Sequence, residues 1–326
     1  MTYTVDAALE RRRVRRKLTF WRVVTLLLIA AMVLAAALYF GNSQPSRAVP
    51  HIAKVSITGT IYNNEDLLKR LKAIADNDMV KGVILDISSP GGTTTGGEVI
   101  YDAVRKISDK KPVVTQVGTL AASAGYMIAI ASDHIIAHKT SMVGSIGVLF
   151  QYPDISGLME KVGVKLESIK SSPLKAEPNP FSPTTPEARA MIDNTVKDTY
   201  DWFVGLVKER RPMITADKLP ALTNGSIYTG RQALQHQLID ALGDQETSII
   251  WLASKGIDKE LPVIEWKAAA SPYSDLLSST LTKLVLRNIG FSEQSSSLLD
   301  EQIGKRIFLD GMLSVWHGSD GQKPQQ

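Results

Sequence analysis

The sequence predicts a mainly parallel α/β fold that follows a single N-terminal membrane helix. Between His51 and about Trp266, short aliphatic runs alternate with amphipathic stretches, a pattern typical of strand–helix–strand units. Before them, residues 23–40 form an apolar run without a charged side chain. The 326 residues are sufficient for one large domain or two modest ones.

The apolar run is long enough to cross a bilayer. As a helix, Val23–Phe40 spans about 27 Å, close to the thickness of the hydrocarbon core. The positive-inside rule keeps the basic residues before it in the cytoplasm and sends the following chain across the membrane. We therefore expect a basic cytoplasmic segment at residues 1–22 and an anchor at residues 23–41. A cleaved signal peptide is the alternative, because Ala35–Ala37 offers an A-x-A-like cleavage site.

Net positive charge is confined to the N-terminal segment. The formal net charge is +4, of which residues 1–22 carry +5 and the rest of the chain −1. The rest of the chain is close to neutral, which argues against a nucleic-acid-binding surface on the folded domain. The chain contains no cysteine, which excludes disulfides, thiolate metal sites and cysteine nucleophiles.

The remaining chain divides into three expected parts. Residues 42–50 are polar and proline-bearing and indicate a linker, residues 51–266 form the main domain, and residues 267–326 form a partly disordered tail. Strands are expected at Ala53–Ile57, Val80–Ile87, Pro112–Val117, His134–Ala137, Val143–Phe150 and Lys165–Ser171. Helices are expected near Glu65–Ile74, Gly97–Ile107, Ala122–Ile130 and Pro186–Arg210.

Two glycine-bearing turns follow strands, where open α/β sheets place their ligand sites. In the first, Ser88–Gly92, glycines let the backbone approach a ligand, although this segment taken alone favours an ordinary strand-to-helix turn. The second turn carries Ser123 among small residues before an apolar helix. An exposed hydroxyl beside the free N–H groups of a helix N-terminus suits a nucleophile with an oxyanion site. A serine that simply caps the helix is the alternative.

A serine nucleophile needs a general base. The histidines are His51, His134, His138, His236 and His317, and none stands in an evident His–Asp arrangement with Ser123. A lysine can replace histidine where burial keeps its amine neutral. Lys175, at the start of a proline-rich loop, is the candidate, although most lysines are solvated surface charges.

Five motifs occur in order between about Lys54 and Gly243. They are SSPGG at 88–92, AASAGY at 121–126, MVGSIGV at 142–148, IKSSPLK at 169–175 and YTGRQALQHQLIDALG at 228–243. The ordered set resembles the signal peptide peptidase A family, in its short single-domain bacterial form. The resemblance implies a crotonase/Clp-like α/β spiral fold and a serine endopeptidase that works without metal or cofactor.

The resemblance also implies a role for individual residues. Ser123 matches the nucleophile and Lys175 the general base of a Ser–Lys dyad. Ser145 matches the serine that holds the lysine amine, and the backbone N–H groups of Gly92 and Ala124 match the oxyanion hole. The chain departs from the family pattern at Ala124, where glycine is commoner, and in SSPLK, where a glycine often precedes the lysine.

The resemblance further implies partners and location. The substrates would be remnant signal peptides, which are extended apolar segments that can add as a strand beside the catalytic turns. The family forms dome-shaped oligomers, with an octamer as the candidate, in which neighbouring subunits share the dyad. The expected location is the bacterial inner membrane, with one pass through the bilayer and a periplasmic catalytic domain.

Other classes stay open at this point. The same fold hosts acyl-CoA hydratases, in which glycine-turn N–H groups polarise a thioester. A catalytically inactive scaffold of this fold is another possibility, as is a related membrane peptidase with other substrates. Labelling of Ser123 by a serine-reactive probe separates a peptidase from the first two.

Overall fold

The computed structural model describes residues 17, 20–33, 47–267 and 313–315. The chain divides into two compact units, Met1–Val49 and Pro50–Gln326. In the first unit, residues 20–33 are helical. No helix among the described residues is both long and apolar enough to cross a membrane. Because residues 34–41 of the predicted anchor lie outside the described part, the anchor stays a prediction.

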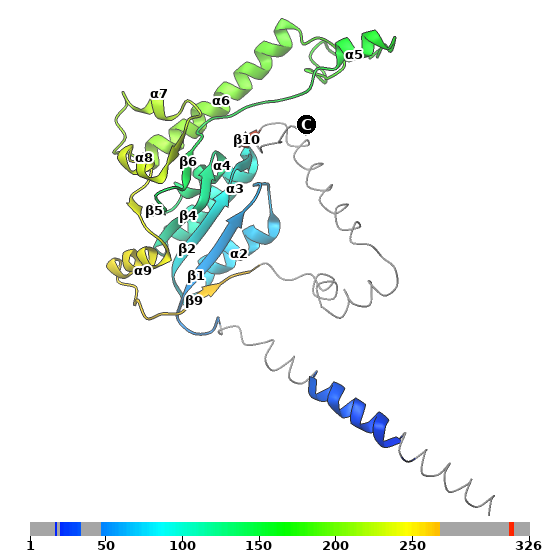
Figure 1. Ribbon diagram of the computed structural model, residues 1–326. Coiled ribbons are helices and arrows are strands. Elements are labelled where there is room, and N and C mark those ends of the chain that lie inside the picture. The colour runs from blue at the N-terminus through cyan, green and yellow to red at the C-terminus, as the bar shows by residue number, and fades with distance from the viewer. Residues whose placement is uncertain (1–16, 18–19, 34–46, 268–312, 316–326) are drawn as a thin grey trace, which may run out of the picture. The chain divides into compact units, whose positions relative to one another are not determined.

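The second unit is built on an eight-stranded, largely parallel sheet (Figure 1). Its main path runs β7-β6-β4-β2-β1-β9, and off this path β5 pairs with β4 and β8 pairs with β5. The strands of this sheet are β1 (His51–Thr58), β2 (Val80–Ser89), β4 (Val113–Ala122), β5 (His134–Ala137), β6 (Met142–Gly144), β7 (Ile227–Thr229), β8 (Ala241–Leu242) and β9 (Val263–Glu265). A separate antiparallel pair joins β3 (Gly91–Thr93) to β10 (Leu313–Val315).

Strand β4 changes its partner along its length. Its first part pairs with β5, from Val114 opposite His134 to Val117 opposite Ala137. Its last residues pair instead with β6, with Ala122 opposite Gly144. On the other side, β4 keeps β2 as its neighbour. The end of β4 therefore lies between β2 and β6, and the chain that follows it lies next to β6.

Helices cover both faces of the sheet. They are α2 (Glu65–Asp76), α3 (Thr94–Ser108), α4 (Ala124–Ala129), α5 (Ser156–Lys161), α6 (Pro186–Arg210), α7 (Leu219–Leu222), α8 (Gly230–Gln235) and α9 (Gln245–Ser254). Successive side chains of β2 point to opposite faces of the sheet. Val83 and Leu85 join the large core with α2 and α3 on one face, whereas Ile84 joins a small cluster under α9 on the other. The predicted mixed α/β fold is thus confirmed.

Most of the expected elements are present, but two strand predictions are wrong. The strand expected at Val143–Phe150 ends at Gly144, because Gly144 and Ser145 both have positive φ, 112° and 50°, which extended strands do not adopt. Residues 165–171 form no strand. They lie exposed, without a neighbouring strand to receive their backbone hydrogen bonds.

Residues 151–185 form an arm that contains α5 and runs away from the sheet (Figure 1). The arm is held by contacts within itself: the Ile155 N–H donates to the carbonyl of Pro180 at 2.9 Å, and the hydroxyls of Tyr152 and Thr184 lie 2.6 Å apart. Many of its apolar side chains are exposed, namely those of Ile155, Leu158, Val162, Val164, Leu166, Ile169, Leu174 and Phe181. Such a concentration of exposed apolar groups marks an interaction surface.

Candidate active site

Ser123 occupies the single position between the end of β4 and the start of α4. Its backbone has φ 57° and ψ −120°, a conformation that costs a non-glycine residue free energy and therefore persists only where its surroundings fix it. The Ser123 N–H donates to the carbonyl of Gly144 at 2.8 Å, and the Ser123 carbonyl accepts from the Met127 N–H at 2.9 Å. Strained serines on sharp strand-to-helix turns are typical of nucleophiles.

Helix α4 is rigidly held, although it is only six residues long. All six residues are buried. The Tyr126 hydroxyl donates to the carbonyl of Leu238 at 2.8 Å inside the core, and burial raises the pKa of this phenol. Because α4 begins directly after Ser123, these contacts fix the direction of the serine side chain.

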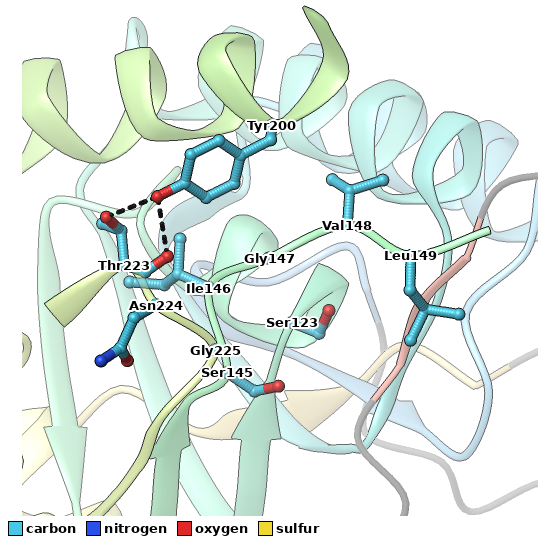
Figure 2. A pocket seen from close by; sticks show the side chains of 10 residues that line it. All are labelled: Ser123, Ser145, Ile146, Gly147, Val148, Leu149, Tyr200, Thr223, Asn224 and Gly225. Carbon is cyan, nitrogen blue, oxygen red and sulfur yellow. Dashed lines mark hydrogen bonds between the residues drawn. The ribbon is translucent and has the colours of Figure 1, made fainter. Parts of the chain in front are cut away.

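Ser123 and Ser145 line the same pocket, whose volume is about 400 Å³ (Figure 2). Ser145 follows β6, and its N–H donates to the carbonyl of Ser226 at 2.7 Å. This bond extends the antiparallel pairing of β6 with β7, in which Val143 lies opposite Tyr228. The motif at 228–243, to which the sequence assigns no catalytic role, therefore supports the strand that carries Ser145.

The Ala124 amide is the first N–H of α4, and the first N–H groups of a helix have no partner within it. The Ala124 side chain is fully buried against α3. A methyl group placed on Gly97 would lie 3.1 Å from the Ala124 Cβ. The absence of a side chain at Gly97 therefore makes room for alanine at position 124.

Gly92 lies in β3, where the backbone of Ile61 approaches it closely. A Cβ on Gly92 would lie 1.8 Å from the Ile61 carbonyl oxygen, so no other residue fits. The carbonyl of Gly91 accepts from the Ile61 N–H, and the Thr93 N–H donates to the Ile61 carbonyl, both at 2.8 Å. Since successive residues of a strand point their polar groups to opposite sides, the N–H and C=O of Gly92 face away from Ile61.

Ser89 organises the turn before Gly92. Its fully buried hydroxyl donates to the carbonyl of Gly59 at 2.6 Å and accepts from the Gly91 N–H at 3.1 Å. These two bonds fix the backbone between β2 and β3, and the open edge of β3 then pairs with β10, with Ser314 opposite Gly92. This edge thus receives an extended peptide segment as an antiparallel strand.

Lys175 lies in an exposed turn of the arm. It is not among the residues that line the pocket of Ser123 within one chain. The nearby Lys170 is engaged, because its amine contacts the Glu177 carboxylate, and this hydrogen bond lowers the pKa of Glu177. Of the two lysines in the IKSSPLK motif, Lys175 is the one that projects outward.

Two of the described histidines, His134 and His51, do not lie near Ser123. His134 starts β5 opposite Val114, and the eight residues from there to the end of β4 measure about 26 Å at ~3.3 Å per residue. Its ring stacks on Trp251, and burial lowers the pKa of His134. His51 accepts from the Trp266 indole N–H at the beginning of β1, in the same region of the sheet.

Part of the pocket was not predicted from the sequence. Tyr200 on α6 and the segment Thr223–Gly225 line it together with Ser123. The Asn224-Gly225 pair is a turn signal that the sequence displays. Nothing in the sequence connects Tyr200 with that turn, because the two are brought together by the packing of α6.

Comparisons with known proteins match this chain to peptidases. A model described as peptidase family S49 matches residues 105–257, and a Clp protease model matches residues 45–144. "Putative protease slr0021" of Synechocystis sp. is 34% identical over 220 residues, which cover 66% of this chain and 79% of that protein. "Putative protease MJ0651" of Methanocaldococcus jannaschii is 33% identical over 242 residues, covering 70% and 78%. "Putative signal peptide peptidase SppA" of Enterococcus faecium is 34% identical over 230 residues, covering 66% and 67%.

Proposed function

Because this chain belongs to peptidase family S49 and is a serine protease, we propose that it cleaves peptides through a Ser123–Lys175 dyad. The observation that carries the proposal is the strained backbone of Ser123, held between β4 and α4 at the wall of a pocket. Family membership favours this reading over an acyl-CoA hydratase or an inactive scaffold.

In the proposed mechanism, the neutral amine of Lys175 takes the Ser123 proton as the Ser123 Oγ attacks the peptide carbonyl. The amides of Gly92 and Ala124 donate to the oxyanion of the tetrahedral intermediate. Lys175 then protonates the leaving amine, and a water that it deprotonates releases the acyl group from Ser123. The Ser145 hydroxyl holds the lysine amine in place.

We assign Lys175 to a neighbouring subunit. It lies on the arm, outside the pocket of its own chain, and the arm exposes the apolar side chains that an interface between subunits would bury. Lys170 is a poorer candidate for the base, because its amine already contacts the Glu177 carboxylate. An arm that docks on the next subunit would remove water from the amine of Lys175.

The proposed substrates are extended apolar peptides, with remnant signal peptides as the main class. The pairing of β10 with β3 supports this choice, because the edge that carries Gly92 already accepts an antiparallel strand. One relative, from Enterococcus faecium, is named as a signal peptide peptidase. We further propose that residues 23–41 anchor the chain in the bacterial inner membrane with the catalytic domain outside the cytoplasm.

A serine-reactive fluorophosphonate probe tests the nucleophile directly. Incubation of the full chain in detergent, followed by mass spectrometry, should locate the probe on Ser123. The Ser123→Ala variant should remain unlabelled and lose at least about 10³-fold in kcat/KM, because no other group supplies the attacking oxygen. Ser141→Ala is the matched control for a buried serine of the same region. Labelling of another serine in the wild type would overturn the assignment.

A further inference from the structure

The pocket beside Ser123 is closed at its far wall by Tyr200 of α6 (Figure 2). In this view the Tyr200 ring reaches from α6 toward Thr223, and its hydroxyl points away from Ser123. Between the tyrosine and the serine lies the segment Ile146–Leu149, which adds apolar side chains to the same pocket. A peptide bound with its carbonyl at Ser123 would therefore place a neighbouring side chain in a compartment with an aromatic wall.

Hydrogen bonds hold the Tyr200 ring in this position. Its hydroxyl donates to the carbonyl of Thr223 at 2.9 Å and lies 2.9 Å from the Thr223 Oγ1. Thr223 is itself fixed, because it is 1% exposed and its hydroxyl donates to the carbonyl of Leu219 at 3.0 Å. The polar end of Tyr200 is thus engaged with α7, and its apolar ring is what remains for a ligand.

We propose that Tyr200 is a specificity-determining residue, which limits the subsite beside Ser123 to apolar side chains of small or medium size. The inference rests on the proposed function, since it takes Ser123 as the nucleophile. The substrate class follows from the lining, in which aliphatic side chains and the Tyr200 ring favour an alanine- or leucine-sized side chain. The polar lining residues, Ser123, Ser145, Thr223 and Asn224, carry no charge. A charged side chain would lose its hydration there without a partner of opposite sign among the described lining residues.

The test compares the full-length wild type, Tyr200→Ala and Tyr200→Phe on peptides that differ only in one residue next to the cleaved bond. That residue is Ala, Leu, Phe, Trp or Lys, and kcat and KM are measured for each. The wild type should prefer Ala and Leu. Tyr200→Ala should raise kcat/KM for Phe and Trp relative to Leu by about tenfold or more, because the far wall is removed. Tyr200→Phe should keep the wild-type order with weaker discrimination, since the ring stays but its two anchoring bonds are lost.

Asp198→Ala, an exposed change on the same helix, is the matched control and should leave the preference unchanged. A folded Tyr200→Ala variant with the wild-type order of preference would overturn the inference. If that variant does not fold, Tyr200→Leu serves the same purpose, and an unchanged preference there has the same meaning. Labelling of Ser123 by the fluorophosphonate probe distinguishes failure of the proposed function from failure of this inference. No labelling in the wild type overturns the proposed function. Labelling of Ser123 together with an unchanged substrate preference in Tyr200→Ala overturns only the role of Tyr200.

Discussion

At the scale of single residues, the site depends on two positive-φ backbone conformations that residues other than glycine seldom adopt. Ser123 has φ 57° and Ser145 has φ 50°, and both line one pocket. Each is fixed by a backbone hydrogen bond across strands, to Gly144 and Ser226 respectively. The conformational strain at these serines is offset by the surrounding sheet, as expected where geometry serves chemistry.

Lys175→Arg tests whether a neutral amine is the base. The variant keeps the positive charge, but a guanidinium does not lose a proton in proteins and cannot accept one from Ser123. We expect kcat/KM to fall by at least about 10³-fold across pH 6–10, because general-base assistance to the nucleophile is lost. The measurement is kcat/KM for one peptide over the pH series, with circular dichroism as a check of folding.

Lys170→Arg is the matched control for that experiment. It lies in the same motif and retains an ion pair with Glu177, so its activity should stay within a few-fold of the wild type. A folded Lys175→Arg variant that performs as well as this control would place the base elsewhere.

At the scale of elements, the contact between α3 and α4 positions Ser123, the proposed nucleophile. The Ala124 methyl group fits because Gly97 has no side chain, and the Met127 sulfur would lie 3.0 Å from a methyl group on Gly97. Alanine in place of this helical glycine would favour α3 by about 1 kcal/mol through propensity alone. Crowding of the new methyl group against α4 opposes that gain, so the effects of substitutions at Gly97 and Ala124 on stability should be coupled.

A double-mutant cycle measures the coupling. Gly97→Ala should lower kcat/KM by pushing α4, and adding Ala124→Gly should restore much of the loss. For the free energy of unfolding, the expected interaction is about 0.5–3 kcal/mol in favour of the double variant. Urea titrations of the wild type, the two single variants and the double variant give the free energies of unfolding, and peptidase assays of the same four proteins give kcat/KM. Strictly additive effects would show that the two helices do not press on each other at this point.

At the scale of the whole molecule, the exposed arm predicts that the dyad forms between subunits. Ser123→Ala and Lys175→Ala should each be inactive, whereas subunits mixed during refolding should recover activity. With equal amounts, about a quarter of head-to-tail interfaces would join an intact lysine to an intact serine, which sets the expected recovery relative to the wild type.

The control for complementation is a mixture of Lys175→Ala with Lys175→Arg, which contains no intact lysine and should stay inactive. Size-exclusion chromatography checks that the mixed subunits assemble. Assembled mixtures of Ser123→Ala and Lys175→Ala without recovery would mean that the serine and the lysine act within one chain.

Topology is the other prediction for the whole chain. If residues 23–41 cross the membrane with the basic segment inside, protease added to intact spheroplasts should digest the domain after residue 50. A tag placed before Met1 should remain protected until the membrane is opened with detergent. Immunoblotting follows both parts, with a cytoplasmic protein as the control for intact cells. Protection of the domain would contradict the orientation.

The sequence by itself determined much of the sheet and the position of the serine. Period-2 and helical patterns predicted β5 and α6 with the bounds that the structure has, because the apolar sides of both elements are buried locally against the core. The small residues around Ser123 indicated the turn between β4 and α4, because sharp turns and close packing admit little else. The ordered motifs also led to the right family, and one of them, SSPGG, contains Gly92, where the close approach of the Ile61 backbone admits only glycine.

Only the tertiary structure decided which of these parts meet. The sequence treated Val143–Phe150 as one strand, and positive φ at Gly144 and Ser145 ends it so that Ser145 lies at the pocket. The expected strand at residues 165–171 lies instead in the exposed arm. Tyr200 and Thr223 are 23 positions apart, and a hydrogen bond across α6 and α7 makes them one wall. Local patterns carry information about burial along one element, whereas a pocket wall and a strand's neighbours depend on contacts between distant segments, which no local pattern encodes.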